Sequence, residues 1–161
     1  MSKLSELKGA CEGRTVAVLC GGPDTFQQSQ KLPGDSVLIS VNAHAALLFN
    51  CDYIVFNDAH NTTTGEEWGD ILLDRPGVRV SIIKHLSEVE DDVGLWDAGF
   101  SAGTATWVAC HLGGAPVVLC GADCYTSDRD YFWNKPGEYP RRDHFGAESL
   151  QHNSPLEGHL K

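Results

Sequence analysis

The chain lacks any apolar stretch long enough to cross a bilayer. Its longest apolar stretches, residues 53–56 and 115–120, are only a few residues long, whereas a membrane-spanning helix needs about 20. The first residues also lack the hydrophobic region of a signal peptide. We therefore expect a cytoplasmic protein without a membrane span.

Positive charge is scarce. The 161 residues include 12 Lys and Arg against 22 Asp and Glu, which gives a formal net charge of −10. Such a chain offers no broad basic surface, so we expect neither a nucleic-acid backbone nor an anionic membrane as a partner. A local acidic run, which we expect to form a solvated loop, consists of Glu88, Glu90, Asp91 and Asp92.

Motifs for metals and common cofactors are also missing. None of the six cysteines forms a Cys-x-x-Cys pair, and the pair Cys120 and Cys124 has no matching histidine pair. We therefore expect reduced thiols and no metal site. The chain contains neither GxGxxG nor GxxxxGK[ST], which argues against dinucleotide and P-loop chemistry. No cofactor is predicted.

What the chain does contain is an alternation of short apolar runs with helical patterns. The expected strands are residues 15–20, 36–41, 52–56, 78–83 and 116–120, and the expected helices are residues 24–32, 43–49, 66–73 and 101–112. This alternation predicts a mostly parallel sheet, for which right-handed crossovers make a doubly wound topology the simplest. We predict a single-domain Rossmann-like α/β fold over residues 1–161, with about five strands and helices on both faces. Its core is expected at about residues 13–125, with a loop-rich tail over the cleft at residues 126–161.

Small and polar residues collect where these strands end. Because the carboxyl ends of parallel strands meet at one edge, where open α/β sheets bind ligands, we expect a ligand cleft there. An asparagine at such an edge can read a ribose or a base through its donors and acceptor. The alternative is that these are ordinary turn residues. The strand-end residues are Gly21, Gly22, Asn42, Asn57, Asp58 and Asp123.

The helix expected from Ser101 begins with small residues. Ser101, Ala102 and Gly103 would leave backbone N–H groups at the helix N-terminus uncovered, which suits a phosphate. An ordinary capped crossover helix is the alternative. Together with the strand ends, this helix start predicts a nucleotide site.

These motifs resemble those of the bacterial sialyltransferases of glycosyltransferase family 42 and, more distantly, the motility-accessory-factor glycosyltransferase domain. The resemblance covers roughly residues 15–131. The family's Gly-Asn-Gly-Pro-Ser loop is matched by residues 20–24, and its Thr-Ser-Gly helix start by residues 100–103. Its strand-end asparagines and its Gly-x-Asp-x-Tyr block with a second tyrosine are matched by Asn42, Asn57, Gly121, Asp123, Tyr125 and Tyr131.

The resemblance implies a metal-independent glycosyltransferase that binds a CMP-sugar of the sialic-acid type and transfers the sugar to a hydroxyl acceptor. In that reading Tyr125 and Tyr131 donate to the leaving phosphate, and His144 is the general base, with His60 the second candidate. Two alternatives stay open: a sugar-nucleotide binding module without transfer activity, and an ATP-using enzyme similar to pterin diphosphokinases. The expected partner is a nucleotide-sugar, and homo-oligomerisation stays open.

Overall fold

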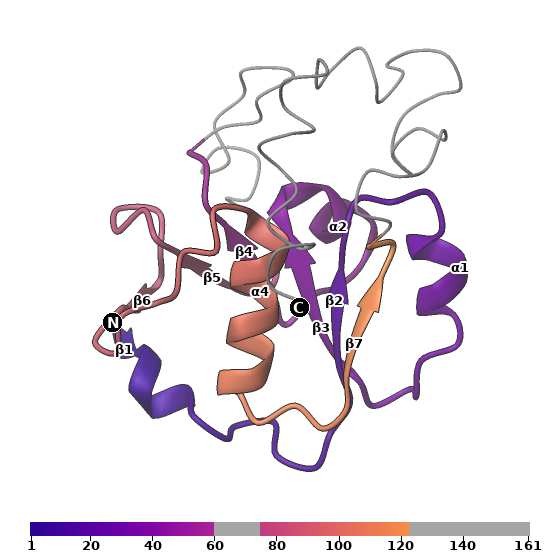
Figure 1. Ribbon diagram of the computed structural model, residues 1–161, viewed down its shortest axis with the longest axis horizontal. Helices are drawn as coiled ribbons and strands as arrows, with labels where there is room; N and C mark the ends of the chain where they lie inside the picture. The colour runs from indigo at the N-terminus through magenta and orange to yellow at the C-terminus, as the bar shows by residue number, and fades with distance from the viewer. Residues whose placement is uncertain (60–74, 123–161) are drawn as a thin grey trace, which may run out of the picture.

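A computed structural model describes residues 1–59 and 75–122 of the chain (Figure 1). Its main sheet has five parallel strands in the order β5-β4-β3-β2-β7. The predicted α/β class and the parallel five-stranded sheet are confirmed, and every strand lies within its expected residues. The strands are β2 (Val16–Leu19), β3 (Val37–Val41), β4 (Tyr53–Phe56), β5 (Val78–Ser81) and β7 (Val117–Cys120).

Three helices accompany this sheet in the described residues: α1 (Thr25–Ser29), α2 (Asn42–Leu48) and α4 (Ser101–His111). Each overlaps an expected helix, and the helix expected at residues 66–73 lies outside the described residues. None of the helices in the described ranges is long and apolar enough to span a membrane.

The core is divided between the two faces of the sheet. Ala105 and Val108 of α4 belong to the same cluster of buried residues as Val16 and Val18, whereas Ala45 of α2 belongs to the cluster that contains Ala17 and Leu19. Because successive residues of a strand point to opposite faces, α4 and α2 pack against opposite faces. Figure 1 shows α4 in front of the sheet.

The N-terminal segment forms structure that the sequence analysis does not predict. Strand β1 (Ser2–Lys3) pairs in parallel with β6 (Val89–Glu90), and a short 3-10 helix, η1 (Leu4–Leu7), follows. The Leu4 side chain is fully buried in the main cluster. His111 at the end of α4 lies with Nε2 2.8 Å from the Leu4 carbonyl oxygen. The segment is therefore held to β6, with which it forms a separate two-stranded sheet, and to α4.

The four acidic side chains are exposed, as predicted for a solvated segment, but not all of the run is loop. Glu90 is part of β6, and Glu88 forms an ion pair with Arg79 at 3.3 Å. Asp92 accepts hydrogen bonds from the backbone N–H and the hydroxyl of Ser5, which lower the pKa of its carboxyl group. These carboxylates hold neighbouring segments together.

Candidate functional site

The strands of the main sheet point in one direction, so their carboxyl ends share one edge (Figure 1). Asn42 directly follows β3 and Asn57 directly follows β4, and these two strands are hydrogen-bonded neighbours. The backbone N–H of Asn57 donates to Ser101 Oγ at 3.2 Å. The first residue of α4 therefore meets the strand ends, as predicted from the sequence.

The Asn57 carboxamide is fixed by its amide nitrogen. Nδ2 donates to Asp97 Oδ1 at 3.1 Å and to Thr104 Oγ1 at 3.0 Å. Exchanging the two ends of the carboxamide would put its oxygen against the Asp97 carboxylate, so the observed orientation is the favourable one. The remaining atom, Oδ1, is buried and has no hydrogen-bond partner among residues 1–59 and 75–122.

Asn42 occupies the junction between β3 and α2 in a left-handed conformation, with φ +58°. Asparagine tolerates this conformation better than most residues do. Its backbone carbonyl accepts the hydroxyl of Ser40. The side-chain oxygen Oδ1 is buried and, like that of Asn57, finds no partner in the described part of the chain.

Two buried acceptors without donors are costly. Leaving such a group unsatisfied costs about 1–3 kcal/mol, and buried polar atoms in proteins are nearly always paired with protein, water or ligand. The two oxygens stand at the ends of adjacent strands, where α/β sheets bind ligands. A group that pairs with these two oxygens must therefore offer N–H or O–H donors.

The first turn of α4 adds donors to the same edge. Phe100, and not Ser101, is the N-cap residue, and its side chain caps nothing. The Ser101 hydroxyl accepts the Asn57 N–H and keeps its own proton for an acceptor. The N–H groups of Gly103 and Thr104 donate to the Phe100 carbonyl. Those of Ser101 and Ala102 have no partner among the described residues.

Two of the predicted site glycines are explained by packing. A Cβ on Gly103 would lie 2.5 Å from Ala98 Cβ and 2.7 Å from Phe100 Cζ. A Cβ on Gly22 would overlap the carbonyl oxygen of Gly121, to which the Gly22 N–H donates at 2.9 Å. Contacts within the protein therefore require glycine at both positions, and the predicted approach of a ligand to these two residues stays a prediction.

The other predicted residues have varied surroundings. Gly21 is half-buried, Asp58 is exposed, and Ala102 packs against the main cluster. Five predicted site residues lie outside the described residues: His60, Asp123, Tyr125, Tyr131 and His144.

Asp97 and Thr104 belong to the site although the sequence analysis does not predict a role for either. Both hold the Asn57 amide, and Asp97 also accepts the Gly99 N–H at 2.9 Å. An aspartate two residues before a glycine is a known turn signal, which predicts the bond to Gly99. Nothing in the local sequence predicts the bond to Asn57, which lies 40 residues away.

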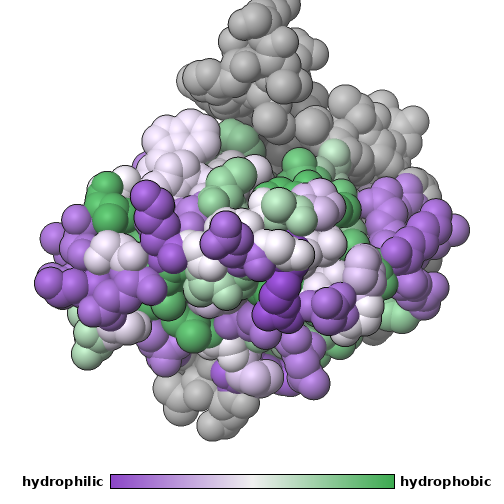
Figure 2. All heavy atoms as spheres, turned by 90° about the horizontal axis from the view of Figure 1, so that it is seen from below, coloured by the Kyte–Doolittle hydropathy of each residue, from purple (hydrophilic) through white to green (hydrophobic). Residues whose placement is uncertain are grey.

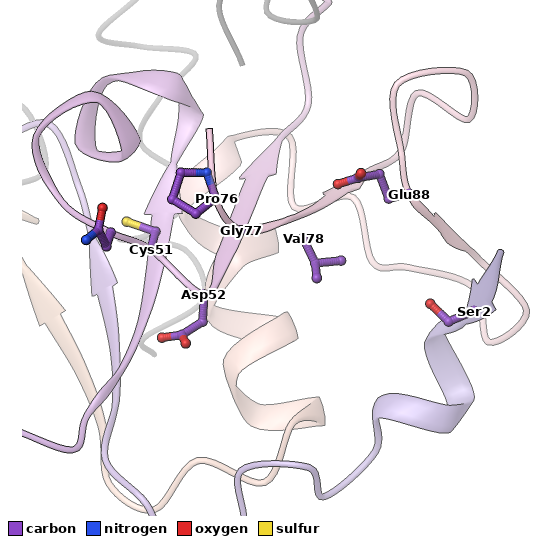
Figure 3. Close-up of a pocket in the computed structure, with 8 residues that line it drawn as sticks. Ser2, Cys51, Asp52, Pro76, Gly77, Val78 and Glu88 are labelled. Atoms are coloured by element: carbon purple, nitrogen blue, oxygen red, sulfur yellow. The ribbon is translucent and has the colours of Figure 1, made fainter. Parts of the chain in front are cut away.

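An open pocket of about 590 Å³ lies at the opposite edge of the sheet, next to the starts of β4 and β5. Figure 3 shows its carboxylates, Asp52 and Glu88, on different sides of the opening. Both already accept backbone N–H groups, from Leu38 and Arg79. Burial and the neighbouring Asp52 raise the pKa of the Cys51 thiol to about 12, so this thiol is not a nucleophile at neutral pH. The lining residues are Ser2, Asn50, Cys51, Asp52, Pro76, Gly77, Val78 and Glu88.

The molecular surface on the side where the strands start is mostly hydrophilic, with separate smaller hydrophobic areas (Figure 2). Among the described residues no group of three or more His, Cys, Asp or Glu side chains could hold a metal ion. None of the five described cysteines forms a disulfide.

Comparison with protein-family models, with curated proteins and with solved structures finds no match. A function therefore has to be inferred from the residues at the carboxyl edge of the sheet.

Proposed function

We propose that the carboxyl edge of this sheet binds a sugar nucleotide. We also propose that the fold is Rossmann-like and doubly wound, and that the function is glycosyltransferase-like. The observation that carries the proposal is the pair of buried side-chain oxygens, Asn42 Oδ1 and Asn57 Oδ1, without donors in the described residues. They stand at the ends of the adjacent strands β3 and β4. A ribose, with its hydroxyl groups, and an amino-bearing base both present the missing donors.

The first turn of α4 supports a phosphate in the same ligand. The N–H groups of Ser101 and Ala102 and the Ser101 hydroxyl can donate to phosphate oxygens. A helix N-terminus also carries a partial positive charge that favours an anion. The strand ends offer acceptors to a nucleoside, and α4 offers donors to a phosphate. This combination fits a nucleotide.

The nucleotide class and the chemistry come from the sequence resemblance. It favours a CMP-sugar, with Tyr125 and Tyr131 as donors to the leaving phosphate and His144 as the base. Such a reaction uses hydrogen-bond donors in place of a metal ion. A binding module without transfer activity and an ATP-using enzyme similar to pterin diphosphokinases are the competing outcomes.

A ligand panel tests the proposal. The melting temperature of the full chain would be measured with CMP, CDP, UDP, CMP-sialic acid, and ATP with magnesium. We expect selective stabilisation by the cytidine compounds, because a ligand that binds only the folded state raises its stability. A response to ATP with magnesium alone, or no response to any nucleotide, would contradict the proposal. Release of CMP from CMP-sialic acid separates a transferase or hydrolase from a binding module.

A further inference from the structure

A carboxylate determines which way the Asn57 side chain is turned. Asn57 Nδ2 donates to Asp97 Oδ1 at 3.1 Å and to Thr104 Oγ1 at 3.0 Å. The Thr104 hydroxyl can donate as well as accept, so it could pair with either end of the carboxamide. A carboxylate only accepts, and it would repel the carboxamide oxygen. Of these two contacts, therefore, only the one with Asp97 distinguishes the two orientations of the Asn57 side chain.

Both partners of this contact are held in place. Asp97 Oδ1 also accepts the Gly99 N–H at 2.9 Å, and a backbone N–H can only donate. This bond keeps an oxygen atom of residue 97 at the contact. Asn57 is held through its backbone as well, because its N–H donates to Ser101 Oγ at 3.2 Å. The orientation of the carboxamide is therefore built into the loop before α4.

This orientation leaves Asn57 Oδ1 as the end of the carboxamide that a ligand can meet. The atom is buried and has no hydrogen-bond partner among the described residues. It can accept from the amino group of cytosine or adenine or from a ribose hydroxyl. A keto oxygen, such as that of uracil at the place of the cytosine amino group, would oppose it, because two acceptors would then face each other without a hydrogen atom.

We propose that Asp97 determines the ligand specificity of this edge. By holding the Asn57 carboxamide as an acceptor, it makes the site select a ligand with an N–H or O–H donor at this point over a ligand with an acceptor there. The inference rests on the proposed function and deepens it by assigning selectivity to one contact. The donor is the base amino group or a ribose hydroxyl. Asp97 acts through Asn57 and is a positioning residue.

The test measures the affinity of four ligands for the full chain by isothermal titration calorimetry. They are CMP, UMP, and two CMP analogues in which fluorine replaces the 2′ or the 3′ hydroxyl. An unpaired buried acceptor costs about 5- to 150-fold in affinity, so the wild type should prefer CMP over at least one of the other three by a factor in this range. Preference over UMP assigns the contact to the base, and preference over a fluorinated analogue assigns it to the ribose.

Variants of two aspartates in the same loop test the role of Asp97. Asp97→Ser keeps a hydroxyl that can accept the Gly99 N–H but allows the Asn57 carboxamide to reverse, so the preference should fall. Asp97→Asn should keep the preference, because the Gly99 N–H holds an amide oxygen where the carboxylate oxygen was. Asp91→Ser is the matched control: Asp91 accepts the Leu95 N–H at 2.8 Å and takes no part in the Asn57 contacts, so the preference should stay.

The outcomes separate the two proposals. If the wild type binds no nucleotide, both proposals are wrong. If the wild type binds all four ligands equally well, the nucleotide site stands and the specificity role of Asp97 is wrong, whether or not the variants fold. That role is also wrong if Asp97→Ser weakens every ligand by the same factor, or if Asp91→Ser lowers the preference as much as Asp97→Ser does.

Discussion

Asn42 and Asn57 each follow directly after one of two neighbouring strands, but they have different structural roles. The Asn57 amide joins β4 to the loop before α4 through Asp97 and Thr104. Asn42 instead supplies a left-handed turn into α2. What they share is a buried side-chain oxygen without a donor among the described residues. This shared property is the reason why the proposal assigns both oxygens to one ligand.

Cys51 provides a residue-scale prediction about pH. Its pKa rises from 9.0 to about 12, because of burial and then the nearby Asp52. In the unfolded chain the thiol ionises near pH 9, whereas in the folded protein it stays neutral up to about pH 12. The stabilisation that this group contributes to the folded state is therefore fully present below pH 9. It is lost between pH 9 and about 12, at about 1.4 kcal/mol per pH unit.

We therefore expect the free energy of unfolding of Cys51→Ala to fall less steeply over this range than that of the wild type, as measured by urea titration at each pH. Cys110→Ala is the control, since Cys110 is exposed and its removal should leave the slope unchanged. Parallel curves for the wild type and Cys51→Ala would show that the Cys51 thiol ionises equally in both states.

At the scale of elements, hydrogen bonds hold the turn between β2 and α1 and the helix α1 against the end of β7. The Thr25 hydroxyl lies 2.6 Å from the Cys20 carbonyl oxygen and 2.7 Å from that of Gly22. Gln28 Oε1 accepts the Gly121 N–H at 2.8 Å. The first helix thus carries side chains that satisfy the backbone where two neighbouring strands end.

Gly22→Ala should destabilise this junction. Its new methyl group would overlap the Gly121 carbonyl oxygen, which is backbone and cannot rotate away. Overpacking of this kind costs about 1–3 kcal/mol, which would appear as a lower denaturation midpoint. Gly34→Ala is the control, because a Cβ there meets nothing within 4 Å. Equal stability of the two variants would mean that the two turns are not in contact.

Much of the element order can be predicted from the sequence, because a buried parallel strand is a continuous apolar run between turn residues. Val16–Leu19 and Tyr53–Phe56 are such runs, and both are buried strands. The pairing of Ser2–Lys3 with Val89–Glu90 has no such signal. Both strands have two residues, and they depend on Leu4 reaching a cluster formed by distant parts of the chain.

At the scale of the whole molecule, the sequence predicts which edge of the sheet collects polar residues but not how they are used. In the sequence, Gly22 and Gly103 resemble the glycines of ligand-binding loops. Only the packed structure shows that Gly121, Ala98 and Phe100 fill the space beside them. The bond between Asn57 and Asp97 likewise depends on tertiary structure. The predicted roles of Tyr125, Tyr131 and His144 stay predictions, since these residues lie outside the described ranges.

The strand order bears on the proposed ligand site at this edge. The chain runs from β2 through β3 and β4 to β5 on one side, and β7 returns to the other side of β2. Reversal of strand order in a parallel sheet opens a crevice outside the carboxyl ends. Here the reversal lies between β2 and β7, whose ends are packed together through Gly22 and Gly121. The two buried oxygens without donors among the described residues stand beside that point, at the ends of β3 and β4.

The most direct test of the central claim is the affinity of the Asn42→Gly variant for CMP, measured by calorimetry beside its thermal stability. Glycine accepts the positive φ of this position and removes only the carboxamide. If Asn42 Oδ1 accepts a hydrogen bond from the ligand, affinity should fall about tenfold, which corresponds to one net hydrogen bond. The melting temperature of the free protein should stay the same or rise, because an unpaired buried acceptor is gone.

Asn50→Ala is the matched control for this measurement, since Asn50 lies at the opposite edge of the sheet and should bind CMP as the wild type does. The account predicts lower affinity with unchanged or higher stability for Asn42→Gly alone. Unchanged CMP affinity together with a lower melting temperature would show that the Asn42 side chain serves the fold and not a ligand, and would contradict the account.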